Sequence, residues 1–298
     1  MDRKEKKMPA AYTHYKFGQD VLYCLSDKKV REVIAHYPKM FDLGLYGPDL
    51  LFYYGIPSRA DLHHLGFVLH RQEAAAFFGD AKDIILGKNV ILNHEGNEKA
   101  GYARGAGLSY ILGMICHFVL DCKCHDYIDH FIKNEGLGHA EVEMDLEREL
   151  LARDGYSPIH YNPVNIQLSR KEAAQIARFY PGVTAREIGI SLQHMRKVTG
   201  WLLPSNRIKK GTLHSLFGLS GHYHILKGLL IRAHANEACE TTTVGLLDCY
   251  ETAILVACDL MVHYCRYVMG LEELSPFFYR TYGAKLEEIE EKEERDKS

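Results

Sequence analysis

Apolar residues recur at three- and four-residue spacing along most of the chain, and few stretches alternate as half-buried strands do. Glycine and proline interrupt this pattern, for example at Gly47-Pro48, Ser157-Pro158 and Pro181-Gly182. The sequence therefore predicts an all-α protein. The segments with helical periodicity are 18–36, 60–79, 104–133, 139–153, 170–179, 184–199, 212–236 and 240–270.

Helix breakers are densest at 155–168, GYSPIHYNPVNIQL. This cluster predicts a boundary between a region at 9–153, which holds the dense groups of histidine and acid, and a helical region at 154–283 that packs on it. Residues 284–298 read as a charged tail. At 47% hydrophobic and 25% charged residues, the chain of 298 residues has the composition of a globular protein with a sizeable core.

The formal net charge of −3 comes from residues 284–298, which contain seven acids and four bases. The rest of the chain is formally neutral, so no nucleic-acid partner is expected. The basic N-terminus is not followed by the apolar segment of a secretory signal. Acids and a histidine interrupt both long apolar stretches, so we expect a cytoplasmic protein without a transmembrane segment.

Eight cysteines without regular spacing are expected to be reduced thiols in a chain of this kind. Cys122 and Cys124 are separated by one residue, which is not the C-x-x-C spacing of a zinc knuckle. The sequence gives no strong reason to treat this pair as metal ligands.

The stretch HFVLDCKCHDYIDH at 117–130 places three histidines and three acids within an apolar helical pattern. His117, Asp121 and His125 are four residues apart and share one helix face, and His139 and Glu143 repeat this spacing on the next helix. Carboxylates beside imidazoles are costly to bury unless they are paired or bind a metal. Nitrogen and oxygen ligands suit zinc, so the two faces predict a metal site.

Each of these residues also has a simpler interpretation. His125 could lie at the surface, His139 could begin a helix after a glycine-rich turn, and Glu143 could be one of many exposed acids in EVEMDLERELL. Taken together with Asp121 in an apolar run, they favour a shared site.

Five ordered motifs over roughly residues 9–150 resemble the zinc-dependent phospholipases C of bacteria, whose fold is shared with the S1/P1-type nucleases. The resemblance implies a single multi-helix domain with additional C-terminal helices. The motifs are Ala11-Tyr12-Thr13-His14 with Phe17-Gly18, Leu45-Tyr46-Gly47-Pro48-Asp49 with Phe52-Tyr53-Tyr54, His70 ahead of Phe77-Phe78, His117-x-x-x-Asp121-x-x-x-His125, and His139-x-x-x-Glu143.

Carried over residue by residue, the resemblance implies two or three zinc ions. One would be bound by His70, His117 and Asp121, and a second by His125, His139 and Glu143. A third would be held by His14 with the shared Asp121. Asp49 would orient or deprotonate the attacking water.

Two departures from the family pattern leave alternatives open. Exported members complete the third zinc site with their N-terminal amine, whereas here MDRKEKK precedes the first motif, with Met8 as an alternative start. The spacing from Asp121 to His125 is also short, which makes His130 a competing ligand. We favour His125, because His130 is rotated by about 180° from Asp121 on an ideal helix.

The resemblance implies a phospholipase C-like hydrolase, in which a metal-bridged hydroxide attacks the phosphorus of a phospholipid or related phosphodiester. Transient contact with a membrane surface would fit such a substrate. The aromatic run Phe52-Tyr53-Tyr54 could line a choline site, but core packing is the simpler interpretation.

Two other functions are weighed against this one. His125-Asp126 matches the HD dipeptide of HD-type metal phosphohydrolases, in which case Asp126 would face the metal and Glu143 the solvent. A non-catalytic helical protein stabilised by zinc is the other alternative.

Overall fold

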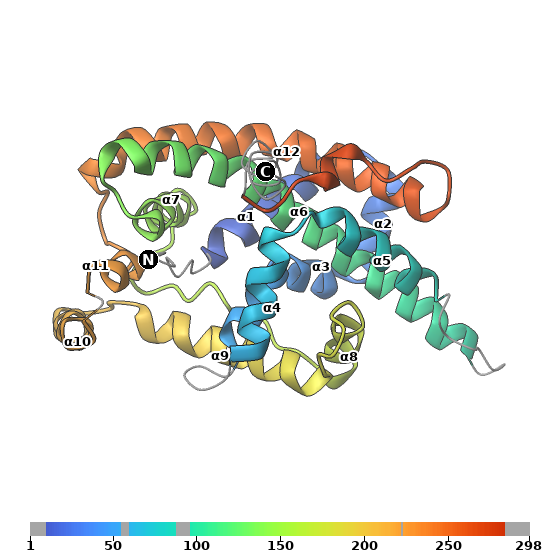
Figure 1. Cartoon of the computed structure of the whole chain (residues 1–298), viewed down its shortest axis with the longest axis horizontal. Coiled ribbons are helices and arrows are strands. Elements are labelled where there is room, and N and C mark those ends of the chain that lie inside the picture. The colour runs from blue at the N-terminus through green and yellow to red at the C-terminus, as the bar shows by residue number, and fades with distance from the viewer. Residues whose placement is uncertain (1–9, 55–59, 88–95, 222, 284–298) are drawn as a thin grey trace, which may run out of the picture.

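The computed structural model describes residues 10–54, 60–87, 96–221 and 223–283. Within these ranges the chain forms helices and no strand, which confirms the all-α prediction (Figure 1). The α-helices are α1 (Ala11–Cys24), α2 (Lys28–His36), α3 (Pro38–Gly44), α4 (Ala60–Arg71), α5 (Ala74–Leu86), α6 (Gly96–Glu135), α7 (His139–Arg153), α8 (Arg170–Ala177), α9 (Ala185–Leu202), α10 (Arg207–Leu219), α11 (Tyr223–Leu226) and α12 (Glu240–Val268). The 3-10 helices are η1 (Gly47–Tyr53), η2 (Lys227–Leu229), η3 (Glu237–Cys239) and η4 (Pro276–Tyr279).

Three of the predicted segments are wrong in extent. Segment 18–36 is divided between α1 and α2, because Asp27 leaves the helix and its side chain accepts a hydrogen bond from the backbone N–H of Val30. Segment 60–79 is divided between α4 and α5 at Glu73, whose backbone is extended. Segment 212–236 ends its helix early, since Gly221 has a φ of +72°.

Helix α6 is the centre of the protein, and α3, α12, α1 and α5 pack around it (Figure 1). It approaches α3 very closely at Gly113 and Gly44. A Cβ on Gly113 would lie 2.1 Å from the carbonyl oxygen of Phe41, and one on Gly44 would lie 2.1 Å from that of Tyr110. Glycine at both positions therefore allows the two backbones to touch.

The stretch Gly101–Phe131 of α6 is long and apolar enough to cross a membrane by length and composition alone. In this structure 89% of its apolar window is buried against other parts of the protein. Its apolar side chains are accounted for by the protein core.

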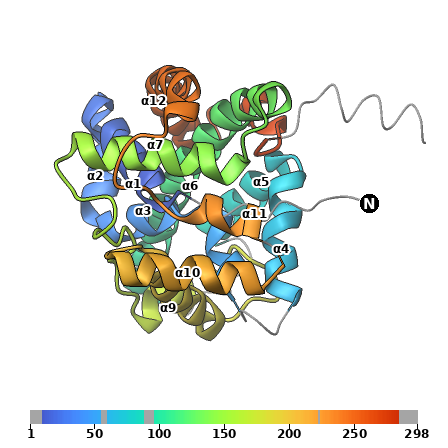
Figure 2. The same ribbon diagram turned by 90° about the vertical axis from the view of Figure 1, so that its left-hand side faces the viewer.

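The region after residue 154 shares the same core. Ile188 and Met195 of α9 and Leu246 and Tyr250 of α12 belong to the main cluster of buried apolar residues. A second, smaller cluster of Leu202, Leu213, Phe217 and Leu230 attaches α10 to the end of α9. Figure 2 shows α10 as an outer layer lying across α9. The expected charged tail at 284–298 and the alternative start at Met8 lie outside the described residues.

Candidate metal centre

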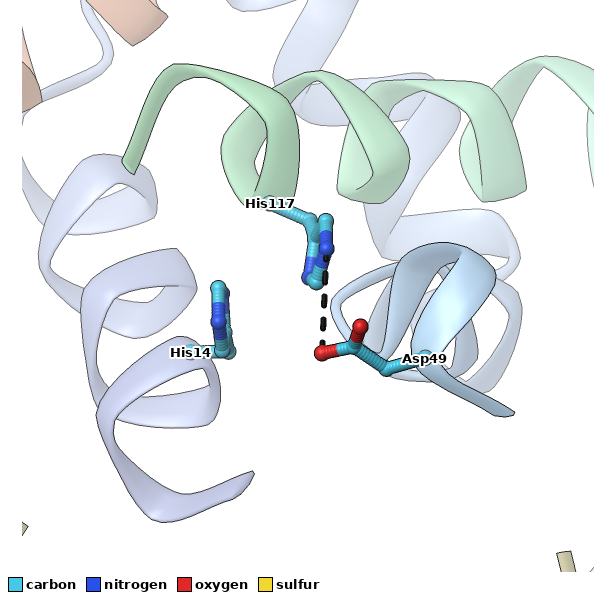
Figure 3. Close-up of side chains that lie close together, drawn as sticks. All are labelled: His14, Asp49 and His117. Atoms are coloured by element: carbon cyan, nitrogen blue, oxygen red, sulfur yellow. Dashed lines mark ion pairs between the residues drawn. The ribbon is translucent and has the colours of Figure 1, made fainter. Parts of the chain in front are cut away.

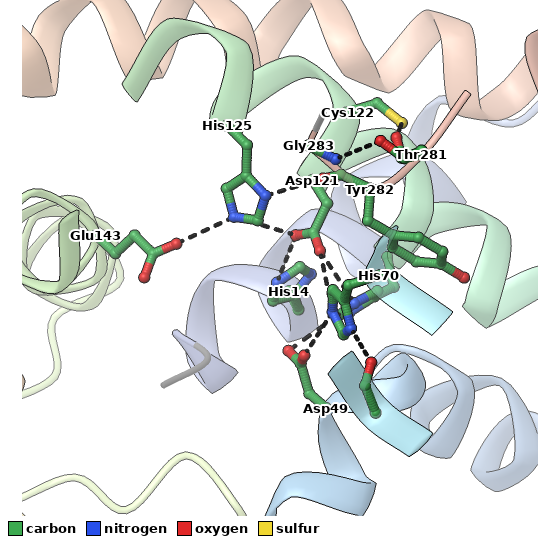
Figure 4. A network of polar contacts seen from close by, with 12 residues as sticks. His14, Asp49, His70, Asp121, Cys122, His125, Glu143, Thr281, Tyr282 and Gly283 are labelled. Carbon is green, nitrogen blue, oxygen red and sulfur yellow. Dashed lines mark hydrogen bonds and ion pairs between the residues drawn. The ribbon is translucent and has the colours of Figure 1, made fainter. Parts of the chain in front are cut away.

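Five separate elements bring the eight predicted site residues into one buried region. Figure 4 shows His14, Asp49, His70, Asp121, His125 and Glu143 converging there. His14 comes from α1, Asp49 from η1 and His70 from α4. Helix α6 provides His117, Asp121 and His125, and α7 provides His139 and Glu143. A cavity reaches this region, and its wall also includes the apolar side chains of Leu120, Ile128 and Leu146.

The first group of candidate ligands is His70, His117 and Asp121, whose ligand atoms all lie within 4.8 Å of one another. Asp121 Oδ2 is 3.3 Å from His117 Nε2 and 3.7 Å from His70 Nε2. Ligand atoms bound tetrahedrally to one zinc at about 2.1 Å are roughly 3.4 Å apart. The spacing of this group therefore suits a zinc ion.

The second group is His125, His139 and Glu143, which also lie within 4.8 Å of one another. Glu143 Oε1 is 2.9 Å from His139 Nε2 and 3.2 Å from His125 Nε2. The other oxygen of Asp121, Oδ1, lies 4.0 Å from His125 Nε2, so Asp121 stands between the two groups.

His14 and Asp49 lie next to the first group. The His14 ring is stacked on that of His117, with a centroid separation of 4.1 Å. Figure 3 shows these two rings side by side, with the Asp49 carboxylate below His117. His14 Nε2 is 3.4 Å from Asp121 Oδ1. Asp49 Oδ1 is 3.0 Å from His70 Nε2. Asp49 also forms a third group of possible ligands together with His14 and His117. Asp49 thus lies among the candidate ligands themselves.

Local backbone features place these side chains. Gly47 has a φ of +53°, and a Cβ there would lie 2.4 Å from the His117 ring, so only glycine lets η1 bring Asp49 so close to α6. Glu147 of α7 accepts hydrogen bonds from the backbone N–H groups of Tyr12 and Thr13, which fixes the first turn of α1 that carries His14.

Three histidines are oriented by backbone carbonyl groups. Nδ1 of His70 is 2.7 Å from the carbonyl oxygen of Gly66, Nδ1 of His117 is 3.1 Å from that of Leu45, and Nδ1 of His125 is 2.9 Å from that of Tyr282. These contacts assign the proton of the neutral ring to Nδ1.

The Nε2 lone pairs of these rings then face carboxylate oxygens at 3.0 to 3.3 Å. Two acceptors face each other at such distances only with a cation or a proton between them. This arrangement, with each imidazole fixed through its other nitrogen, is the one that a zinc ligand set requires.

The electrostatics of the region agree with cation binding. Burial alone would raise the pKa of Asp121, but His117 and His125 hold it well below its usual range. Burial would also raise the pKa of Glu143, and His139 and His125 lower it instead. Both carboxylates are therefore ionised at neutral pH, as zinc binding needs. In addition, His117 Nε2 and Glu143 Oε2 are among the buried side-chain atoms of the described residues that have no hydrogen-bond partner of good geometry.

The two stacked histidines differ in protonation. Burial and the neighbouring charge of His117 lower the pKa of His14 to about 4. Burial would lower the pKa of His117 as well, but the carboxylates of Asp121 and Asp49 offset this and raise it to about 9. A cation bound beside these carboxylates would replace the proton on His117.

The structure also places the competing candidates. His130 and Asp126 are exposed, whereas His125 and Glu143 face one another inside the centre. This geometry is the reverse of the one that an HD-type site needs. Burial raises the pKa values of Cys122 and Cys124 well above the usual value of a thiol, so both stay protonated at neutral pH. All eight cysteines are free thiols, and Phe52 and Tyr53 are buried in the core, as expected.

Two features of the centre were missed by sequence reasoning. Asp129 Oδ1 lies 3.6 Å from His139 Nδ1, and its i+4 spacing from His125 could have revealed it. The second is the segment 280–283, which we call the C-terminal strap. Its Tyr282 carbonyl orients His125, and the Tyr282 ring packs against His70 and His117. No spacing rule links Tyr282 to residues so distant in sequence.

The family described as zinc dependent phospholipase C matches residues 13–186, which is more than half of the chain and includes all eight site residues. No curated protein and no solved structure matches the chain.

Proposed function

The chain belongs to the zinc-dependent phospholipase C family, and we propose that it hydrolyses a phosphodiester bond of a phospholipid or a related molecule. The observation that carries this proposal is the pair of ligand groups on either side of Asp121. In both groups, imidazole nitrogens face ionised carboxylates in a buried cavity.

We assign His70, His117 and Asp121 to one zinc ion and His125, His139 and Glu143 to a second, with His14 beside Asp121 available for a third. When bound, such ions lower the pKa of water and neutralise negative charge on a phosphoryl group. The carbonyl groups of Gly66, Leu45 and Tyr282 keep His70, His117 and His125 oriented towards the carboxylates.

Asp49 is the residue that we assign to the attacking water. Its carboxylate is buried, lies 3.0 Å from His70 and faces the first ligand group. An Asp49 oxygen can accept a hydrogen bond from the water and take its proton as the new bond to phosphorus forms and the bond from phosphorus to the leaving oxygen breaks. The leaving oxygen takes a proton from water and departs as an alcohol. The same cavity has apolar side chains of Leu120, Ile128 and Leu146 in its wall.

This proposal is tested by measuring hydrolysis of a short-chain phosphatidylcholine and of bis(p-nitrophenyl) phosphate by the zinc-loaded protein. We expect turnover by the wild type, and a kcat that is about a hundredfold lower for Asp49→Asn because the proton acceptor is weakened. The zinc content of each sample is measured alongside, and Asp80→Asn, a substitution at an exposed site on α5, serves as the matched control.

Failure of the zinc-loaded wild type to hydrolyse either phosphodiester would contradict the proposed function. Zinc that stabilises the chain without any turnover would instead support a non-catalytic zinc protein.

A further inference from the structure

Residues 188–236 form the most basic part of the chain. They contain no acid and seven bases: Arg196, Lys197, Arg207, Lys209, Lys210, Lys227 and Arg232. Subtracting these charges from the net charge of −3 leaves −10 for the rest of the chain. The segment begins just after residue 186, where the family match ends, so it is a feature of this chain outside the matched region.

Within this segment, α10 has apolar residues on its outer face. Ile208 and Leu219 are 84% and 86% exposed, and Leu216 is 46% exposed. At 100° per residue, Ile208 and Leu219 lie within about 20° of each other on the helix, and Leu216 lies about 80° from Ile208. Leu213 and Phe217 occupy the opposite face and are buried against α9 and the segment after α11.

Basic residues flank this exposed apolar stripe. Arg207 and Lys209 lie about 100° to either side of Ile208, whereas the exposed Lys210 lies about 200° from Ile208, on the other side of the helix. Lys209 Nζ donates to the carbonyl oxygen of Gly200, so the start of α10 lies beside the end of α9. Trp201, the next residue of α9, is half-exposed there. Within the part of the chain that the structure describes, none of these three bases forms an ion pair with a carboxylate, whereas Arg232 pairs with Glu141.

We propose that this surface, defined as Trp201, Ile208, Leu216 and Leu219 with Arg207 and Lys209 and called the α10 face, docks on an anionic lipid membrane. An amphipathic helix lying in the membrane interface places apolar side chains among the acyl chains and bases at the lipid phosphates. The negative charge of the rest of the chain opposes contact through other surfaces, which favours docking through this face. The inference rests on the proposed function in that docking would bring the enzyme to a phospholipid substrate.

The apolar residues distinguish this partner from nucleic acid and from a second copy of the chain. Exposed Ile208 and Leu219 gain nothing from a phosphate backbone, to which bases alone would bind. A second copy would place one set of bases against the other, where like charges repel. A lipid surface satisfies both the apolar and the basic side chains.

The test is co-sedimentation of the zinc-loaded full chain with vesicles of phosphatidylcholine alone or mixed with phosphatidylglycerol. We expect binding to the mixed vesicles only. Replacing Ile208, Leu216 and Leu219 by serine should weaken that binding by about tenfold or more, because apolar burial is lost. Arg207→Glu with Lys209→Glu should weaken it similarly by removing the attraction to anionic lipid.

The matched control replaces three apolar residues of comparable exposure outside the α10 face, Val244, Leu255 and Leu271, by serine. This control should bind as the wild type does. Absence of wild-type binding to mixed vesicles would overturn the proposal. Vesicle binding that is unchanged by the serine substitutions and is competed away by duplex DNA would also overturn it. A dimer that is seen in sedimentation velocity and is dissociated by the serine substitutions would overturn it as well.

Hydrolysis of the same vesicles is measured separately. Binding without hydrolysis would support the α10 face and contradict the proposed function. Hydrolysis of soluble phosphodiesters without vesicle binding would support the proposed function and contradict membrane docking through the α10 face.

Discussion

Glu147 lies one helical turn beyond Glu143 on α7 and shows how a single buried acid supports the centre. Its carboxylate accepts hydrogen bonds of 2.9 Å and 3.3 Å from the backbone N–H groups of Tyr12 and Thr13. Burial raises its pKa to about 7, an effect that these hydrogen bonds only partly offset. The residue thus stabilises the start of α1 while carrying a charge that is costly to bury.

This pKa predicts a pH dependence of stability. A carboxyl with a raised pKa binds its proton more tightly in the folded state, so its contribution to the free energy of unfolding is complete below about pH 4.5 and is lost as the pH rises towards 7. Glu147→Gln keeps an acceptor oxygen without the charge. Relative to the wild type, the variant should gain up to about 3 kcal/mol in going from pH 4.5 to pH 8.

Urea denaturation of both zinc-free proteins at the two pH values measures this difference, because the titration of the histidines is common to both. The same change with pH in wild type and variant would contradict the buried, proton-binding state of Glu147.

At the residue scale, the sequence could predict ligand types and shared faces. His117, Asp121 and His125 follow from i+4 spacing, and the resemblance added His14, Asp49 and His70, which no spacing connects to them. The orienting carbonyl groups could not be predicted. Leu45, Gly66 and Tyr282 contribute only backbone atoms, so their side chains carry no signal of this role.

At the scale of elements, the C-terminal strap is the least expected contributor to the centre. It follows η4, far from the ligands in sequence, and its backbone lies against α6 (Figure 4). Cys122 Sγ donates to the carbonyl oxygen of Thr281, and a Cβ on Gly283 would lie 2.7 Å from His125 Nδ1. The strap therefore fits His125 only with glycine at position 283.

Gly283→Ala should displace His125 and weaken zinc binding by the group of His125, His139 and Glu143. Loss of an orienting contact typically lowers metal affinity by about 10- to 100-fold. The matched control is Gly189→Ala on α9, where an added Cβ has no neighbour within 4 Å. Competition with a zinc chelator measures affinity, and circular dichroism checks that both variants are folded. Zinc affinity in Gly283→Ala equal to that of the control would exclude a positioning role for the strap.

Long helices were predicted more accurately than short ones. Helices α7 and α12 were predicted near their observed bounds, because each repeats its apolar spacing over several turns. The predicted segment 104–133 ends close to the end of α6, but α6 begins eight residues earlier, at Gly96. The short elements α3 and η1 were missed, since seven residues give too few repeats. Yet η1 carries Asp49, which the sequence identified only through the resemblance.

At the scale of the whole molecule, one core supports a centre assembled from distant parts of the chain. Helix α6 supplies three candidate ligands from the most buried position, and α1, η1, α4 and α7 bring the others to it. The boundary near residue 154 stays a prediction. Residues on both sides of it contribute to the main core. Long-range packing of this kind leaves no local pattern, so sequence periodicity could predict the helices but not their arrangement.

Family membership and the geometry of the centre together make zinc binding through Asp121 the central claim. The most direct test is the zinc content per chain, measured by plasma emission on wild type and Asp121→Asn purified without added metal, with the exposed Asp126→Asn as control. We predict two or three zinc ions in the wild type and control, and at least one fewer in Asp121→Asn. One zinc ion or none in the wild type, with the same content in Asp121→Asn, would contradict the account.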